Sequence, residues 1–233
     1  MPTVVIIAGG VATRLRPITE TIPKALLMVA DKPFIAHQLL LLKKNGVKRV
    51  VICSGYLSHQ IEEFVGDGSQ FGLSVKFSVD GDKLLGTGGA VKKALPLLED
   101  EFFVMYGDSY LTVDFKNVYD YFAQHQNMGL MTVFKNHNAW DNSNIVFEGG
   151  KIVIYDKKRK VQGMDYIDYG LGILRKPAFD AMSSRDVFDL AELYQDLIAK
   201  NQMLGYQVPE RFYEIGSPKG LAETESYFLN LKK

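Results

Sequence analysis

The stretch Ile6–Pro17 reads I-I-A-G-G-V-A-T-R-L-R-P and is preceded by only five residues. Its first residues complete the apolar run Val4–Ile7, which indicates a buried strand that leads into a glycine-rich loop. Small residues in such a loop let phosphate oxygens approach the backbone N–H groups closely. Arg14 adds a planar charged fork, and Lys24 adds a second cation. The stretch therefore predicts a phosphate site behind the first strand of an α/β sheet.

The spacing of the glycines excludes the two commonest phosphate loops. A Walker loop requires G-x-x-x-x-G-K followed by Ser or Thr, and no such run follows this strand. A dinucleotide loop requires G-x-G-x-x-G, whereas Gly9 and Gly10 are adjacent and no third glycine is in register. The remaining alternative to a phosphate site is an ordinary strand-to-helix turn that happens to contain glycines.

Composition limits the class of protein. The chain has 233 residues, 47% of them hydrophobic, and its 27 Lys and Arg balance 27 Asp and Glu. This balance predicts no nucleic-acid partner and no attraction to an anionic membrane, so a local site must hold any nucleotide. Cys53, the single cysteine, ends an apolar run and is expected to be a buried thiol. The sequence has no signal-peptide pattern and no apolar run long enough to span a bilayer, so we expect a cytoplasmic protein.

The first half alternates apolar runs with amphipathic segments. This rhythm predicts a parallel sheet with helices on both faces, and ligands bound beyond the carboxyl ends of the strands. Asp31 is expected to cap the first helix. The expected strands are Val4–Ile7, Val50–Cys53, Leu73–Val79 and Phe102–Tyr106, and the expected helices are Asp31–Asn45, Leu57–Val65 and Ala90–Leu98.

The second half predicts a different arrangement. Gly149 and Gly150 form a hairpin turn between two of its strands. The expected strands are Leu130–Phe134, Asn144–Glu148, Lys151–Tyr155, Tyr166–Leu174 and a short Phe212–Ile215, and the expected helices are Asp189–Lys200 and Ser217–Leu231, the latter capped by Ser217. The fold class is therefore α/β: a Rossmann-like, mixed but mainly parallel sheet flanked by helices, with a small antiparallel insertion.

The first motif resembles the signature of the sugar-phosphate nucleotidylyltransferases, or nucleotide-sugar pyrophosphorylases. That signature runs G-G-x-G-T-R-L-x-P-x-T and is followed by P-K. Ala12 stands where the family has its next glycine, which costs about 1 kcal/mol if that position needs a positive φ. The matching residues are Gly9, Gly10, Thr13, Arg14, Leu15, Pro17, Thr19, Pro23 and Lys24.

The resemblance extends from Val4 to about Leu221 and implies the nucleotide-diphospho-sugar transferase fold. It implies a single domain, residues 1–233, with a nucleotide half at about 1–110 and a sugar-phosphate half at about 111–233. The implied partners are a nucleoside triphosphate and a sugar 1-phosphate, and the products are a nucleotide-sugar and pyrophosphate. Arg14 and Lys24 are the implied catalytic cations, and the implied nucleotide-binding loop is Ala8, Gly9, Gly10, Val11, Ala12 and Thr13.

A second glycine cluster, L-G-T-G-G-A at Leu85–Ala90, resembles the family's loop for the base and ribose. The resemblance implies that Gly86, Thr87 and Gly88 contact the nucleotide. Glycine-rich turns before helices are common, so an ordinary turn is the alternative.

Two acids are the implied ligands of Mg²⁺. Asp108 follows the strand Phe102–Tyr106, and an aspartate at a strand's carboxyl end can hold this ion. Glu214, in E-I-G-S-P, stands where the family has an aspartate, and its extra methylene leaves direct, water-mediated or shifted ligation open. The plain alternatives are a turn cap for Asp108 and a surface acid beside a helix cap for Glu214.

The sugar-phosphate site is implied by looser matches. Lys157 resembles the lysine of the family's E-K-P element, although Lys158 could be the equivalent residue. Asp168 and Gly170 resemble the family's N-x-G element. The alternative for the lysines is a solvated basic turn.

The length and the segments L-G-T-G-G-A and I-D-Y-G-L resemble small bacterial enzymes of two kinds. One acts on heptose 1-phosphate with GTP, which we favour slightly, and the other on N-acetylmuramate 1-phosphate with UTP. Either would serve surface polysaccharide or cell-wall synthesis, as a monomer or a homodimer. Ala12 and Glu214 also leave open a non-catalytic nucleotide-sugar sensor. A glycosyltransferase is disfavoured because Gly107–Tyr110 lacks D-x-D.

Overall fold

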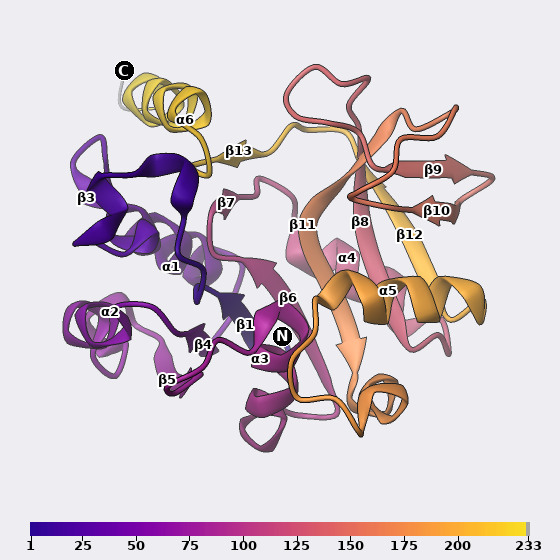
Figure 1. Cartoon of the computed structure of the whole chain (residues 1–233), viewed down its shortest axis with the longest axis horizontal. Helices are drawn as coiled ribbons and strands as arrows, with labels where there is room; N and C mark the ends of the chain where they lie inside the picture. The colour runs from indigo at the N-terminus through magenta and orange to yellow at the C-terminus, as the bar shows by residue number, and fades with distance from the viewer. Residues whose placement is uncertain (232–233) are drawn as a thin grey trace.

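A computed structural model describes residues 1–231 and contains the predicted parallel sheet. Its strands lie in the spatial order β6-β1-β4-β5 (Figure 1). In this register Val5 of β1 pairs with Val51 of β4 and with Val104 of β6. The four strands are β1 (Val4–Ile7), β4 (Arg49–Ser54), β5 (Ser74–Val79) and β6 (Glu101–Tyr106), so the four strands predicted for the first half are confirmed.

The second half of the chain extends the same sheet from β6. The long strand β11 (Tyr166–Arg175) runs antiparallel to β6 and to β8 (Gly129–Lys135). β12 (Met203–Val208), which was not predicted, pairs in parallel with β8. β9 (Ile145–Glu148) and β10 (Lys151–Tyr155) form the predicted hairpin. All strands of this sheet except β10 and β11 therefore point the same way, which confirms the mixed, mainly parallel class.

Alternating side chains of the strands face two hydrophobic layers. Val4 and Ile6 belong to one core cluster, and Val5 to the other. The first layer contains α1 (Phe34–Lys44), α2 (Ser58–Val65) and α4 (Phe115–Ala123), whereas the second contains α3 (Gly86–Ala94) and α5 (Leu190–Ala199). Figure 1 shows α3 and α5 together on the face nearer the viewer. The helix α4 was not predicted.

Two predicted helix starts are wrong. Asp31 caps no helix, because β2 (Met28–Val29) and β3 (Lys32–Pro33) form a small hairpin and α1 begins only at Phe34. α3 begins at Gly86, not at Ala90, so the second glycine cluster is the first turn of the helix. Tertiary packing explains this start, since a Cβ on Gly88 would lie 2.3 Å from the Phe188 ring.

The end of the chain returns to the N-terminal half. Ser217 caps α6 (Pro218–Asn230) as predicted, and its hydroxyl accepts the Gly220 N–H at 3.0 Å. Just before this helix, β13 (Tyr213–Glu214) pairs antiparallel with β7 (Ser109–Tyr110). This short pairing sets Glu214 opposite Ser109, beside the end of β6.

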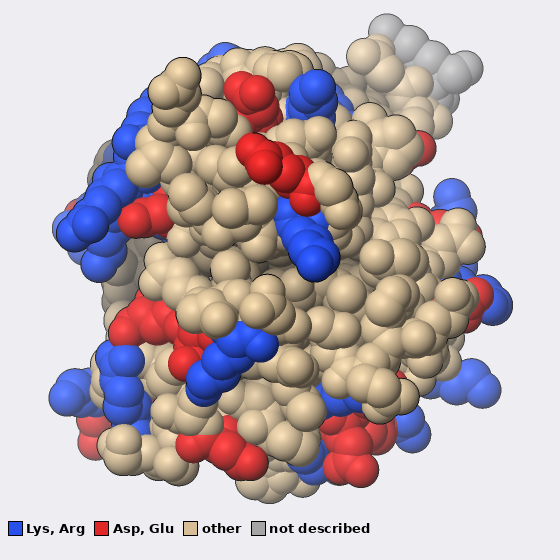
Figure 2. Space-filling model, turned by 90° about the vertical axis from the view of Figure 1, so that its right-hand side faces the viewer, with Lys and Arg blue, Asp and Glu red and all other residues tan. Residues whose placement is uncertain are grey.

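Charges of both signs are mixed on the surface. Figure 2 shows acidic and basic side chains next to one another on the face that carries the β9–β10 hairpin. Among the helices of residues 1–231, none has the length and apolar character needed to cross a bilayer.

Candidate functional site

The loop behind β1 is held open by its small residues. A Cβ on Gly9 would lie 3.3 Å from the Gly55 nitrogen, whereas nothing lies within 4 Å of the same position on Gly10. Ala12 has φ +47° and ψ +49°, so this position does need the left-handed conformation, which glycine, the family's residue here, adopts more easily. The Thr19 hydroxyl donates to the Ala12 carbonyl oxygen at 2.9 Å and fixes the turn.

One of the two predicted cations, Lys24, is paired with an acid that follows β6. The Lys24 Nζ lies 2.7 Å from Asp108 Oδ2, with both side chains partly exposed. Burial opposes ionisation of Asp108, but the charge and hydrogen bond of Lys24 outweigh it and lower the pKa of this carboxyl below its ordinary value. Asp108 is therefore an ionised acid that is already paired with a catalytic candidate.

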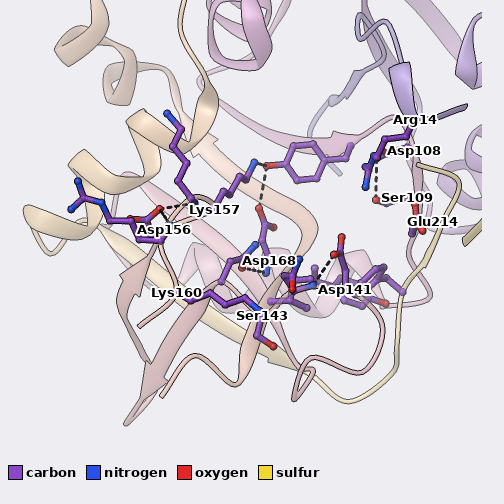
Figure 3. Close-up of a pocket in the computed structure, with 18 residues that line it drawn as sticks. Arg14, Asp108, Ser109, Asp141, Ser143, Asp156, Lys157, Lys160, Asp168 and Glu214 are labelled. Carbon is purple, nitrogen blue, oxygen red and sulfur yellow. Dashed lines mark hydrogen bonds between the residues drawn. The ribbon is translucent and has the colours of Figure 1, made fainter. Parts of the chain in front are cut away.

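Gly216 is the point at which the remaining groups converge. A Cβ built there would lie 2.9 Å from Glu214 Oε2, 3.1 Å from Arg14 Nη2 and 3.2 Å from Asp108 Oδ2. Two hydrogen bonds hold the Glu214 carboxylate in place: its Oε1 accepts the Ser217 hydroxyl at 2.7 Å, and its Oε2 accepts the Gly216 N–H. Residues 14, 108 and 214, distant in sequence, thus surround one small space (Figure 3).

The two carboxylates that converge near Gly216 are the kind of ligand that Mg²⁺ takes. Glu214 Oε2 and Asp108 Oδ2 lie 2.9 and 3.2 Å from the position of a Cβ on Gly216, and Mg²⁺ commonly takes one or two carboxylates together with substrate phosphates. Within residues 1–231 no group of three or more His, Cys, Asp and Glu gathers as a self-sufficient metal site. The donor set therefore fits an ion that arrives with a polyphosphate.

A large cavity begins at these groups and ends at a basic turn. It has a volume of about 510 Å³, and Arg14, Asp108 and Glu214 line one end of it. Figure 3 shows Lys157 and Lys160 toward the other end, with Asp168 between the two. The further lining residues include Tyr106, Ser109, Asp141, Asn142, Ser143, Asn144, Asp156, Lys158 and Arg159. A polar cavity with cations at both ends can hold a phosphorylated, hydroxyl-rich molecule.

Asp168 lies at the centre of a hydrogen-bond network in this cavity. Its Oδ2 accepts the hydroxyls of Tyr106 at 3.1 Å and Tyr155 at 3.0 Å, and its Oδ1 accepts the Gly170 N–H at 3.0 Å. Burial, and then the charge of Asp168, raise the pKa of both tyrosines well above the ordinary value, so both remain donors. Gly170 has φ +97° and lies where the register of β11 shifts, so it shapes the strand at this network.

The basic turn contributes Lys157 most directly. Its Nζ donates to the Tyr106 hydroxyl at 3.2 Å, and it lies 5.1 Å from the centre of that ring. Lys158 lines the same cavity, and its backbone N–H donates to Asp156. Lys157 is thus the lysine tied to the Asp168 network, while both lysines face the cavity.

Two smaller cavities connect the glycine-rich segments. Gly10 and Thr87 line both of them. Ala8, Lys24 and Asp108 line the one nearer the cation cluster, and Gly9 and Gly86 line the other. Val11, Ala12, Thr13, Gly88 and Gly170 line none of these three cavities.

Three residues at these cavities were given no role from the sequence. Tyr106 lines the large cavity and Tyr155 donates to Asp168, and both were predicted only as the last residues of strands. Asp80 follows β5 and lines the cavity between the glycine-rich segments. The rule that ligands bind beyond the carboxyl ends of parallel strands, applied to this strand, would have found Asp80.

The structure also shows the surroundings of Cys53 and Trp140. Cys53 is buried as predicted, and burial followed by the charge of Asp80 raises the pKa of its thiol to about 12. Trp140 stacks on Arg211, whose guanidinium carbon lies 3.3 Å from the ring centre, and it is not among the residues that line the large cavity.

Comparison with known proteins agrees with the site. Residues 3–228 match the nucleotidyl transferase family. The D-glycero-alpha-D-manno-heptose 1-phosphate guanylyltransferase of Campylobacter jejuni is 28% identical, over 92% of this chain and 95% of its own. The N-acetylmuramate alpha-1-phosphate uridylyltransferase of Neisseria meningitidis is 30% identical, over 95% and 96%. The crystal structure of HddC from Yersinia pseudotuberculosis has a TM-score of 0.82 and 25% identity, over 98% and 100%.

The chain therefore belongs to the nucleotidyl transferase family, and its identification as a sugar-phosphate nucleotidyltransferase is confirmed. It is an enzyme of the transferase class.

Proposed function

We propose that this nucleotidyltransferase joins the nucleotidyl group of a nucleoside triphosphate to a sugar 1-phosphate. An oxygen of the sugar phosphate attacks the α-phosphorus, the bond from that phosphorus to the bridging oxygen breaks, and pyrophosphate leaves with the electron pair. The observation that carries the proposal is the meeting of Arg14, Lys24, Asp108 and Glu214 at Asp108, which lines both the large cavity and the smaller cavity beside Lys24.

The proposed roles follow from charge and position. Arg14 and the N–H groups of Gly9–Thr13 hold the leaving phosphates, and Lys24 holds the α-phosphate and the incoming oxygen. Asp108 and Glu214 hold Mg²⁺, which when bound neutralises phosphate charge and polarises the phosphorus. Lys157 holds the sugar phosphate, Asp168 and Gly170 form the sugar site, and Gly86, Thr87 and Gly88 form the site for base and ribose.

The particular substrates are the finer part of the proposal. We favour D-glycero-D-manno-heptose 1-phosphate with GTP, in the synthesis of a bacterial surface polysaccharide. Support comes from the resemblance of L-G-T-G-G-A and I-D-Y-G-L to small enzymes of that kind and from the Campylobacter relative. N-Acetylmuramate 1-phosphate with UTP is the alternative, supported by the Neisseria relative. We place either reaction in the cytoplasm, in one domain with a nucleotide half and a sugar half.

A nucleotide-sugar sensor is the second candidate. One observation favours it: both carboxylate oxygens of Glu214 already accept hydrogen bonds from Gly216 and Ser217. A sensor would bind the nucleotide-sugar without turning it over.

Pyrophosphate release decides between the two candidates. The purified protein is incubated with Mg²⁺ and each pairing of four nucleoside triphosphates with heptose, mannose, glucose and N-acetylmuramate 1-phosphates. Release from one pairing identifies the enzyme and both substrates. No release from any pairing, with thermal stabilisation by a nucleotide-sugar, would favour the sensor.

A further inference from the structure

Asp80 is a charged group that the proposed mechanism does not use. It lies directly after β5 and lines the cavity between Gly9–Gly10 and Gly86–Thr87. The other lining residues of that cavity offer apolar side chains, glycine backbone and the Thr87 hydroxyl. The Thr87 hydroxyl accepts the Leu190 N–H at 2.8 Å and carries no charge. Among the residues that line this cavity beside the proposed phosphate loop, Asp80 is therefore the one with an ionisable side chain.

The carboxylate of Asp80 has one oxygen without a partner. The residue is only 9% exposed, and its Oδ2 accepts the Leu85 N–H at 3.1 Å. Its Oδ1 is buried and has no hydrogen-bond partner among the described residues. Lys93 does not supply one, because its Nζ donates to the carbonyl oxygens of Val79 and Asp80.

Such a group costs stability, which suggests a purpose outside folding. A buried acceptor that makes no hydrogen bond costs about 1–3 kcal/mol. Burial raises the pKa of Asp80 above its ordinary value, although the Leu85 N–H and the charge of Lys93 oppose this. A ligand with N–H donors would relieve both penalties. Leu84, which is 42% exposed, lines the same cavity, and its Cδ2 and Asp80 Oδ2 both lie near the position of a Cβ on Gly55, so a ligand that moves Leu84 would approach the carboxylate.

Among the four bases, only guanine has two adjacent donors that this carboxylate can accept from. Guanine presents two adjacent donors on its pairing edge, N1–H and the N2 amino group, which match the two oxygens of a carboxylate. Uracil presents one N–H between two carbonyl oxygens, and adenine and cytosine present a ring nitrogen acceptor beside their amino group. A carboxylate repels each of these acceptors, so it both favours guanine and rejects the other bases.

We propose that Asp80 selects the base: its carboxylate accepts the N1–H and N2–H of guanine, which makes GTP the preferred nucleotide. The inference rests on the proposed function and deepens it, because the relatives include both a guanylyltransferase and a uridylyltransferase.

The test compares GTP with two near-identical nucleotides. ITP lacks the N2 amino group, and XTP carries a carbonyl oxygen in its place. Pyrophosphate release is measured for GTP, ITP, XTP and UTP at a fixed sugar 1-phosphate. The wild type is expected to use GTP with a kcat/KM about 10- to 100-fold above that for ITP, the value of one charged hydrogen bond. Equal use of GTP and ITP, or a preference for UTP, would overturn the proposal.

Asp80→Asn supplies a gain of function that misfolding cannot imitate. The asparagine oxygen can still accept the Leu85 N–H, while its amide N–H₂ matches the carbonyl oxygen of xanthine. The XTP-to-GTP ratio of kcat/KM should rise about 100-fold or more. Asp82→Asn, an exposed change in the same loop, is the matched control and should leave the ratio unaltered. An unaltered ratio in Asp80→Asn would also overturn the proposal.

Two further readouts keep the outcomes separate. If Asp80→Asn fails to fold, the wild-type comparison of GTP with ITP decides alone. If the wild type releases no pyrophosphate from any pairing, the proposed function fails. The dissociation constants of the four nucleotides, measured by calorimetry, then test the selection of guanine independently.

Discussion

The glycine-rich segments and the large cavity bind by different means. Around Gly9, Gly10 and Gly86 the chain offers backbone, because side chains are absent and the space beside Gly10 is open. In the large cavity, side chains from β6, β10 and β11 meet at Asp168. A phosphate common to all nucleotides needs only N–H groups and cations, whereas the hydroxyl pattern of a sugar needs particular side chains. The first region therefore carries the reaction and, through the proposed role of Asp80, the choice of base, whereas the second region selects the sugar.

The largest expected effect belongs to the first region. Lys24→Ala removes the cation on Asp108 and should reduce kcat by roughly 10²- to 10³-fold, the usual loss when one charge-stabilising group is removed from a reaction centre. Steady-state pyrophosphate release measures it. Lys32→Ala, a change of a more exposed lysine close in sequence, is the control and should retain full activity. Near-normal turnover by Lys24→Ala would break the assignment of the reaction to this region.

The second region should respond in KM and in stability. Asp168→Ala leaves the hydroxyls of Tyr106 and Tyr155 and the Gly170 N–H without their acceptor. The free energy of unfolding should therefore fall by about 3 kcal/mol. The KM for the sugar 1-phosphate should rise about 10-fold with the KM for the nucleotide unchanged. Urea denaturation and substrate titrations measure these values. Asp165→Ala, an exposed neighbour, is the control, and an equal rise in both KM values would contradict the division of labour.

The same contrast explains what the sequence could predict. Arg14 and Lys24 follow the first strand and its glycine loop closely in sequence. Because the carboxyl ends of parallel strands meet at one edge of the sheet, Asp108 could be grouped with them in advance. The Tyr106–Asp168 bond joins residues 62 positions apart. It depends on the register between β6 and β11, which no local pattern encodes.

Local patterns also failed where packing decides. The start of α3 at Gly86 depends on Phe188, about a hundred residues later, whose carbonyl oxygen accepts the Gly88 N–H at 3.0 Å. The position of Glu214 depends on the pairing of β13 with β7, each only two residues long. Motif order nevertheless predicted that Glu214 and Asp108 would serve one site, and the two carboxylates do converge.

A smaller effect is the pH dependence of the stability that Asp108 contributes in the first region. Lys24 lowers the pKa of Asp108 below its unfolded value of 3.8, so this group stabilises the fold above about pH 4 and loses that contribution as pH falls through the lower folded pKa. The difference in unfolding free energy between wild type and Asp108→Asn should be constant from pH 7 to about 4 and shrink below it. Denaturant titrations at each pH measure it. If the stability of the wild type relative to Asp108→Asn instead rises as pH falls from 7 to 5, the folded pKa of Asp108 is raised, and burial, not Lys24, dominates there.

The smallest expected effect concerns the backbone of the first region. Ala12 holds φ +47° at the turn where the family has glycine, and a left-handed alanine costs about 1 kcal/mol. Ala12→Gly should therefore raise the free energy of unfolding by up to about 1 kcal/mol, in a denaturant titration with unchanged slope. The same substitution at the exposed helical Ala222 should lower it by about 1 kcal/mol, because glycine weakens a helix interior. If the same Ala→Gly substitution raises the free energy of unfolding at position 12 and lowers it at position 222, the difference is due to backbone strain at Ala12. A loss of stability at both positions would mean that this loop tolerates alanine without strain.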